Sequence, residues 1–191
     1  MYVRGAKKHE EVWLLDRLEE FQFEDPSFRS RDYVFAVDEQ SRKRAGFGRL
    51  RVHTSDPPVC EFANVGVFGG WRDQGVGAHI LERLVELARD QEFETGYALA
   101  EEGDYLHQLG FERVEESDLP DPLPERLDAV RENRPDAVPF RLDFSAFEVP
   151  DRLRQRFADA DDENGSEPEE SAEDFGIDPD SATYKYDTGR R

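Results

Sequence analysis

The sequence predicts a mixed α/β domain at residues 1–147 and an acidic tail at 148–191. Two patterns predict this fold class: short β-forming runs alternate with amphipathic helical segments, and one strand leads through a glycine-rich turn into a helix. Between Asp159 and Asp180 half of the positions are acidic and none is basic, so this segment cannot bury enough apolar surface to fold. We expect a largely disordered tail, apart from one short helix at 151–157. Its last ten residues regain aromatic and basic side chains and could dock onto the domain.

The N-terminal third predicts a strand, a helix and a β-hairpin. A short strand at 2–4 precedes a helix at 9–20, in which large apolar side chains recur on one face. Asp25-Pro26-Ser27 then breaks the helical pattern. Residues 33–37 are a dense β-forming run, and residues 45–53 alternate aliphatic with basic side chains, so two strands joined by a polar turn are expected.

The rest of the domain alternates strands and helices. Residues 59–67 predict a strand, and apolar positions after the glycine turn mark a helix from Val76 to about Asp90. A helix at 103–109 should end on Gly110, the residue type common just past a helix C-terminus. The remaining elements are predicted as strands at 97–100, 111–115 and 138–144 and a helical piece near 125–131.

Composition limits the classes of function. The chain has 191 residues with 37% hydrophobic content, which is enough for one domain with an ordinary core. Its net charge is −20, from 45 acidic and 25 basic residues. Such a surface repels nucleic acid and anionic lipid, so neither is expected as a partner. It is typical of a halophilic-type protein that stays soluble in concentrated salt, where self-repulsion is screened.

The ionisable and apolar residues indicate neither a metal centre nor a membrane segment. The single cysteine, Cys60, excludes an internal disulfide and a multi-cysteine metal site, and the four histidines lack ligand spacing. The N-terminus lacks the apolar stretch of a signal peptide, and no segment approaches about 18 consecutive apolar residues. We expect a cytoplasmic protein, a monomer or a homodimer, that acts on a small molecule.

The glycine-rich turn carries the clearest chemistry. Arg72-Asp-Gln-Gly-Val-Gly77 follows a strand and opens a helix. Gly75 and Gly77 remove side chains where a pyrophosphate must approach backbone N–H groups, and the helix points its positive end at that charge. Arg72 can add a charge-assisted contact. An ordinary strand–helix turn would also fit, whereas a Rossmann turn would need a third glycine and an acidic ribose partner.

The motif Arg72-x-x-Gly75-x-Gly77, with a later helix closing on Leu109-Gly110-Phe111, resembles the GNAT superfamily of acyl-CoA-dependent N-acyltransferases over roughly residues 2–145. The resemblance implies a mostly antiparallel sheet with a splay between the fourth and fifth strands, and acetyl-CoA as co-substrate. Main-chain groups at 65 and 67 would bind the pantetheine arm, and an N–H there would polarise the thioester carbonyl. The implied cofactor-binding residues are Val65, Gly66, Val67, Arg72, Asp73, Gln74, Gly75, Val76, Gly77 and Ala78.

Glu61 is the candidate general base. It stands six residues before Val67, a spacing similar to that of the base glutamate in histone-type members. An ammonium acceptor must lose a proton before it attacks, and we expect partial burial to raise the pKa of Glu61 toward a useful range. The alternative is a solvated strand glutamate. On a regular strand Asn64 would point to the opposite face and serve structure.

Tyr105 is the candidate proton donor to the leaving thiolate. Family members often carry a tyrosine four residues before the glycine of the Gly-Phe helix, but Leu106 holds that position here. Either Tyr105 reaches in from a shifted helix, or water protonates the thiolate, or Tyr105 packs in the core. Cys60 should face away from Glu61 on its strand and be a buried small hydrophobe.

Arg49 and Arg51 share one face of a strand with His53 and are candidates for binding a substrate carboxylate. A looser resemblance to amino-acid N-acetyltransferases of the acetylglutamate synthase kind covers Leu119-Pro120 and the arginines that follow it, Arg126 and Arg134. These arginines could equally be solvated counter-charges on an acidic protein.

Three functions remain open from the sequence. The first is an acetyl-CoA-dependent N-acetyltransferase acting on a small amine or amino acid. The second is an N-acetyltransferase acting on a protein N-terminus or lysine. The third is a non-catalytic acyl-CoA-binding interaction module whose acidic tail recruits a partner. The carboxylate of Glu61 favours the two enzymatic functions. Leu106, at the position where family members often carry a tyrosine, leaves the non-catalytic function open.

Overall fold

A computed structural model describes residues 1–101 and 103–163, so the expectations for 164–191 lie outside the described residues. Seven strands form one sheet in the order β1-β2-β3-β4-β5-β7-β6. Neighbouring strands are antiparallel except β4 and β5, which are parallel. The strands are β1 (Tyr2–Gly5), β2 (Tyr33–Val37), β3 (Arg44–His53), β4 (Val59–Val67), β5 (Thr95–Ala100), β6 (Glu112–Arg113) and β7 (Val138–Asp143). The predicted fold class is confirmed.

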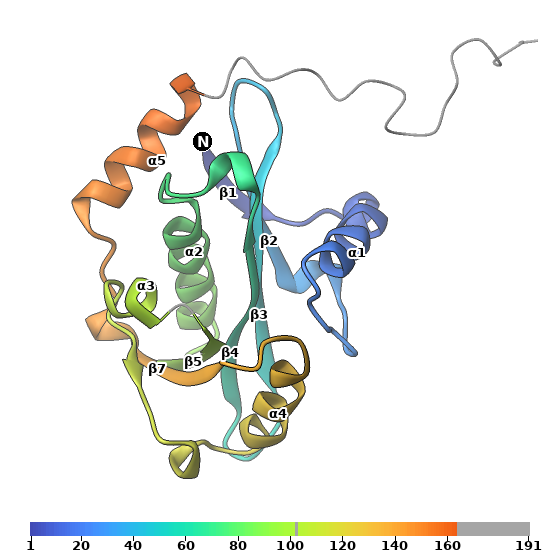
Figure 1. Ribbon diagram of the computed structural model, residues 1–191, viewed down its shortest axis with the longest axis vertical. Helices are drawn as coiled ribbons and strands as arrows, with labels where there is room; N and C mark the ends of the chain where they lie inside the picture. The colour runs from blue at the N-terminus through green and yellow to red at the C-terminus, as the bar shows by residue number, and fades with distance from the viewer. Residues whose placement is uncertain (102, 164–191) are drawn as a thin grey trace, which may run out of the picture.

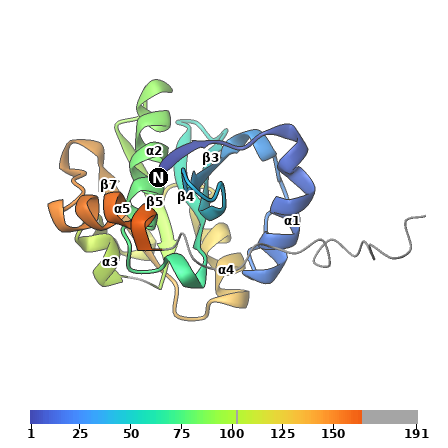
Figure 2. The same cartoon turned by 90° about the horizontal axis from the view of Figure 1, so that it is seen from above.

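Helices cover both faces of the sheet (Figures 1 and 2). One face carries the long helix α2 with α3 and α5, and the other carries α1 and α4. The helices are α1 (Glu11–Glu20), α2 (Val76–Asp90), α3 (Gly103–His107), α4 (Leu123–Asn133) and α5 (Asp151–Glu163). None of the helices described in 1–101 and 103–163 is long and apolar enough to cross a membrane.

The main hydrophobic core lies between α2 and the sheet. Ile80, Leu84 and Ala88 recur on one face of α2 and are fully buried, as the helical period of the sequence predicts. On the opposite face of the sheet, Leu14 and Leu18 of α1 pack in a second core with β2 and β3. The sheet is therefore buried on both faces near its centre, which holds its strands in fixed register.

The sheet splays between β4 and β5. The two strands pair only at Glu61 and Tyr97, and β4 continues for six more residues beyond that point. The register between β3 and β4 also shifts near Asn64, which has a φ of 52°. The prediction that β4 is regular at Asn64 is thus wrong: a β-bulge turns the strand there and changes which side chains face the gap.

Two C-terminal elements differ in length from the sequence-based expectation. The predicted strand at 111–115 is reduced to β6, whose two residues are exposed at the sheet edge. The helix expected over 151–157 instead runs to Glu163 as α5. Leu153, Phe157 and Ala160 are buried in the main core, and their spacing of four and three residues places them on one helix face.

Helix α3 ends at His107, two residues before the predicted end, and the turn that follows it closes on Gly110. Its φ is +91°, and a methyl group there would overlap the carbonyl oxygen of Ala146. We expect Gly110→Ala to lower the free energy of unfolding by about 1–3 kcal/mol, because the backbone strain and the overlap add. Urea unfolding measures this. Gly5→Ala is the control, since a methyl group added at Gly5 would meet no atom within 4 Å, and an equal loss in both variants would contradict the explanation.

Candidate active site

A cavity of about 690 Å³ runs along the splay between β4 and β5. One end is formed by the glycine-rich turn with α3 and α5, and the other by Glu61, α4 and the segment after α1. Its lining includes five arginines and four carboxylates, a positive balance in a chain of net charge −20. The charged lining residues are Arg72, Arg126, Arg134, Arg152, Arg156, Glu24, Glu61, Asp73 and Glu101.

The glycine-rich turn has the geometry that an anion requires. Gly75 caps α2 with a φ of 75°, a left-handed conformation that glycine adopts without strain. Val76 and Gly77 begin the helix, and the first N–H groups of a helix have no partner within it. Gly75, Val76 and Gly77 all line the cavity, as do Arg72 and Asp73. These residues fit the pyrophosphate of an acyl-CoA by the mechanism expected from the sequence.

Tyr105 lies at this same end of the cavity. Its hydroxyl accepts a hydrogen bond from the Ala78 N–H and lies close against Gly77. Burial is the main cause that raises the pKa of Tyr105 to about 12, so the phenol stays protonated at neutral pH. Leu106 is buried in the core beside it. The structure thus brings Tyr105 to the glycine-rich turn, and its role as proton donor to the thiolate stays a prediction.

The strand residues predicted to bind the pantetheine arm lie between the two ends. Val65, Gly66 and Val67 all line the cavity, on the part of β4 that β5 does not pair. Gly66 is closely packed, because a methyl group there would lie 2.9 Å from the rings of Phe21 and Phe47. The unpaired edge of β4 leaves backbone groups available to a ligand, as in strand-addition recognition of extended molecules.

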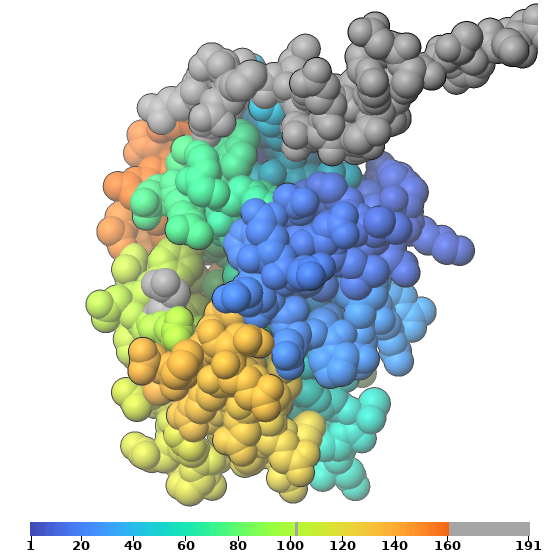
Figure 3. All heavy atoms as spheres, turned by 45° about the vertical axis from the view of Figure 1, so that its right-hand side comes forward, coloured from blue at the N-terminus to red at the C-terminus, as the bar shows by residue number. Residues whose placement is uncertain are grey.

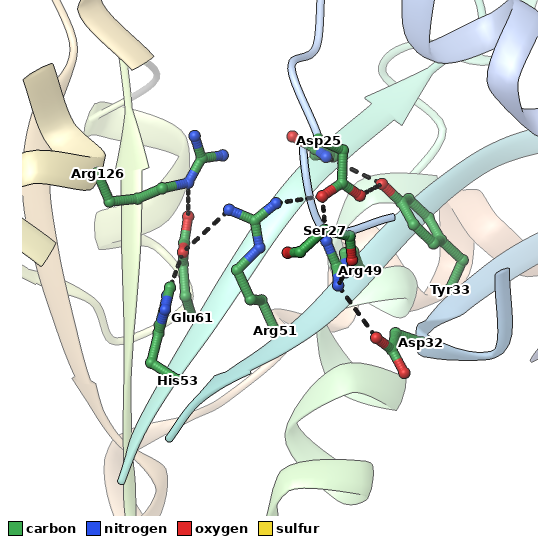
Figure 4. A network of polar contacts seen from close by, with 10 residues as sticks. Asp25, Ser27, Asp32, Tyr33, Arg49, Arg51, His53, Glu61 and Arg126 are labelled. Carbon is green, nitrogen blue, oxygen red and sulfur yellow. Dashed lines mark hydrogen bonds and ion pairs between the residues drawn. The ribbon is translucent and has the colours of Figure 1, made fainter. Parts of the chain in front are cut away.

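Glu61 is the centre of a buried ionic cluster at the other end of the cavity (Figure 4). Only 1% of its surface is exposed. Its Oε2 atom lies 2.8 Å from His53 Nε2 and 3.9 Å from Arg51 Nη1, and its Oε1 atom lies 3.3 Å from Arg126 Nε. The alternative of a solvated strand glutamate is therefore wrong. Three cationic or polar partners hold the carboxylate in one position.

These partners reverse the expected direction of the Glu61 pKa. Burial alone raises the pKa, as the sequence argument assumed. The hydrogen bond with His53 and the positive charges of Arg126 and Arg51 outweigh burial, and they hold the pKa of Glu61 below its ordinary value of 4.5. The expectation of a raised pKa is thus wrong. Glu61 is ionised at neutral pH, which is the state that accepts a proton.

Arg49 and Arg51 are engaged elsewhere. Both guanidinium groups pair with Asp25, which also accepts a 2.5 Å hydrogen bond from the hydroxyl of Tyr33. Arg49 further bonds Asp32 at 3.1 Å. Neither arginine is among the described residues that line the cavity. Arg51 lies behind Glu61, 3.9 Å from its Oε2 atom, but Asp25 folds back from the segment after α1 and occupies both guanidinium groups, so neither arginine is presented to the cavity.

Arg126 and Arg134 of the α4 region lie at the Glu61 end of the cavity, which we name the acceptor end after the role expected of Glu61. Arg126 contacts Glu61 through Nε, and its terminal nitrogens point away from Glu61 in Figure 4. Arg134 donates to the Phe21 carbonyl at 3.0 Å and its guanidinium lies 4.3 Å from the centre of the Phe23 ring. These contacts join α4 to the segment after α1, and the two segments meet in the space-filling view (Figure 3). The looser sequence resemblance had pointed to both arginines.

Sequence reasoning missed three parts of the site. The sequence indicates His53 only as a neighbour of two arginines, although strand alternation places it near Glu61 across the β3–β4 pair. It indicates Asp25 only as part of a helix break. The α5 residues at the glycine-rich turn carried no signal at all, because a contact across some 80 positions leaves no local pattern.

Within residues 1–101 and 103–163, no group of three or more His, Cys, Asp and Glu side chains is arranged to hold a metal ion. Cys60 is a buried free thiol in the main core, and burial raises its pKa to about 12. This confirms the prediction that Cys60 is a buried small hydrophobe.

Comparison with known proteins identifies the family. Residues 4–111 match the acetyltransferase (GNAT) family. The chain belongs to the GNAT family of acetyltransferases. The predicted resemblance is thereby confirmed. A search of curated proteins finds no match to the chain.

Solved structures share the fold. N-acetylglutamate synthase from Neisseria gonorrhoeae, complexed with coenzyme A and N-acetyl-glutamate, is 19% identical with a TM-score of 0.59, over 73% of this chain and 34% of that chain. The Mycobacterium tuberculosis protein Rv2747, in complex with CoA and NLQ, is 19% identical with a TM-score of 0.60, over 74% of this chain and 98% of that chain. This chain therefore spans about a third of the Neisseria enzyme's length. The NatC complex bound to Gag peptide and CoA gives a TM-score of 0.53 at 13% identity, over 75% of this chain and 99% of that chain.

The cluster around Asp25 predicts a stability effect. Asp25→Asn leaves Arg49 and Arg51 buried without their shared counter-charge, so we expect the free energy of unfolding to fall by about 3–5 kcal/mol in urea titrations. Asp32→Asn is the matched control, because Asp32 is partly exposed and pairs with one buried arginine, Arg49, and with the exposed Arg31. It should cost about 1 kcal/mol or less. Equal effects of the two substitutions would show that Asp25 is not the shared anchor.

Proposed function

We propose that this protein is an N-acetyltransferase that moves an acetyl group from acetyl-CoA to the primary amine of a small, carboxylate-bearing acceptor. One observation carries the proposal: a single cavity joins the glycine-rich turn to the buried carboxylate of Glu61. The turn would hold the pyrophosphate and the unpaired edge of β4 the pantetheine arm. That arrangement directs the thioester toward Glu61, where an amine can meet it.

Glu61 acts as general base in this proposal. The acceptor arrives as an ammonium and passes a proton to Glu61, directly or through one water, so that the nitrogen lone pair becomes free. The nitrogen then bonds to the acetyl carbonyl carbon, the carbon–sulfur bond breaks, and the CoA thiolate takes up a proton. A lowered pKa weakens the driving force for the first transfer, but it keeps Glu61 ionised and lets it attract the ammonium.

The arginines of the acceptor end favour an acceptor with a carboxylate. Arg126 lies beside Glu61, so a carboxylate on its terminal nitrogens would place an α-ammonium near Glu61. The contact between Arg134 and the Phe21 carbonyl joins two walls of this end of the cavity. A bridge between the walls favours a small amine or amino acid over a lysine or N-terminus of a folded protein. Arg126 is thus better placed than Arg49 and Arg51 to bind the carboxylate of the acceptor.

The acceptor class is tested by thiol release. Wild-type protein with acetyl-CoA, in high salt, is assayed against amino acids, polyamines and short peptides. We expect release of CoA thiol to be fastest with amino acids that carry a free α-carboxylate, and slower with their amides. Turnover confined to peptides would favour the protein-acetylating alternative. Binding of CoA without turnover on any acceptor would favour the non-catalytic module.

Glu61→Gln tests the mechanism. We expect kcat to fall by about 10²–10⁴-fold, the usual contribution of a general base, while the Kd for CoA stays within about twofold because the glycine-rich turn is untouched. Stopped assays give kcat, and calorimetry gives the Kd and confirms a folded protein. Glu112→Gln, on the exposed edge strand β6, is the control with the same charge change. Full turnover by Glu61→Gln would remove Glu61 from the mechanism.

Arg126→Gln tests acceptor recognition. We expect KM for the amino-acid acceptor to rise roughly tenfold or more, because one charge-assisted hydrogen bond is lost, while KM for acetyl-CoA changes little. The amide of the same amino acid should show a smaller difference between variant and wild type. An equal rise for the acid and its amide would contradict a role of Arg126 in binding the carboxylate.

A further inference from the structure

Helix α5 lies outside the segment that matches the family, yet it packs directly on the glycine-rich turn. The backbone of Leu153 approaches Gly75 so closely that a methyl group on Gly75 would overlap the Leu153 carbonyl oxygen. Phe157 stacks on His79 of α2, with ring centres 3.8 Å apart and planes at 6°. Figures 1 and 2 both show α5 beside α2. Glycine is thus required at position 75 for two reasons: its φ is positive, and the backbone of α5 lies too close to leave room for a side chain.

This packing places two arginines of α5 at the cavity. Arg152 and Arg156 are one helical turn apart and both line the cavity. Arg156 donates from Nη1 to the Asp73 carbonyl at 3.1 Å, and Arg152 donates to the Gln108 side chain. Each guanidinium has five N–H donors, so these bonds leave most of them unused. Arg154 differs: it pairs with Glu82 of α2 at 2.7 Å and is not among the described cavity-lining residues.

The negative charge of the chain makes these arginines important for binding an anionic cofactor. A polyanionic cofactor approaches a protein of net charge −20 against a repulsive field. At the turn itself, Arg72, Arg152 and Arg156 stand against one carboxylate, Asp73. Guanidinium groups match the geometry of phosphate oxygens better than any other side chain. The end of the cavity that would meet phosphate is therefore locally positive, and α5 supplies two of its three arginines.

We propose that α5 is part of the acyl-CoA site and that Arg152 and Arg156 bind a phosphate of the cofactor. The inference rests on the proposed function, because it assumes that the glycine-rich turn holds CoA. CoA carries a pyrophosphate and a 3′-phosphate, and either group presents the same chemistry to the two arginines. Helix α5 thus adds phosphate-binding side chains to a site whose glycine-rich turn lies in the segment that matches the family.

Calorimetry on the full chain tests this in high salt. The double variant Arg152→Gln/Arg156→Gln should bind CoA roughly tenfold more weakly than wild type, the effect of losing charge-assisted bonds to phosphate. Arg154→Gln is the matched control, with the same change on the same helix, and should stay within about twofold of wild type. Thermal unfolding of all three checks that α5 remains packed.

A second titration with dephospho-CoA, which lacks the 3′-phosphate, identifies the group. A loss of affinity seen with CoA and with dephospho-CoA assigns the pyrophosphate, and a loss seen only with CoA assigns the 3′-phosphate. Wild-type affinity in the double variant would overturn the inference, as would an equal loss in Arg154→Gln. Tighter binding by the double variant would also overturn it, and would identify α5 as a helix that obstructs the turn. Failure of wild type to bind CoA would instead refute the proposed function.

Discussion

The buried carboxylate of Glu61 is the constraint on which the site depends. A charge with 1% exposure persists only when neighbouring groups compensate it. Arg51 does so from the opposite register position on β3, His53 from two residues further along β3, and Arg126 from α4. Arg51 also pairs with Asp25, which ties the segment after α1 to the same cluster. Ionic pairing therefore brings together the elements that enclose the acceptor end.

The sequence predicts the strand, turn and helix at the glycine-rich motif well, because each signal there is local. Alternation, glycine placement and helical period occur within about 30 residues, and the structure reproduces β4 and α2 with the expected bounds. The signal at Gly110 is equally local, because glycine is the residue type that adopts a positive φ just past a helix end. The edge strand β6 shrinks because only the pairing with β7 holds it, and sequence alone does not report pairing.

The remaining features depend on partners that are distant in the sequence. The residue type and position of Arg51 indicate a carboxylate partner but cannot indicate that Asp25, from a helix break, takes that place. For the same reason the direction of the Glu61 pKa could not be predicted, since burial and three partners act in opposite directions and only their geometry decides the balance. The packing of α5 on Gly75 likewise joins segments that no periodicity relates.

The account rests on Glu61 being an ionised, ion-paired carboxylate at the acceptor end of the cavity. A ¹³C NMR titration of glutamate side-chain carboxyls measures this directly, with the Glu61 signal assigned by its absence in Glu61→Gln. We predict that Glu61 titrates below 4.5, its ordinary pKa, so its signal stays that of a carboxylate as the pH falls to that value. A midpoint above 4.5 would contradict the account, because it would mean that burial prevails over Arg51, His53 and Arg126.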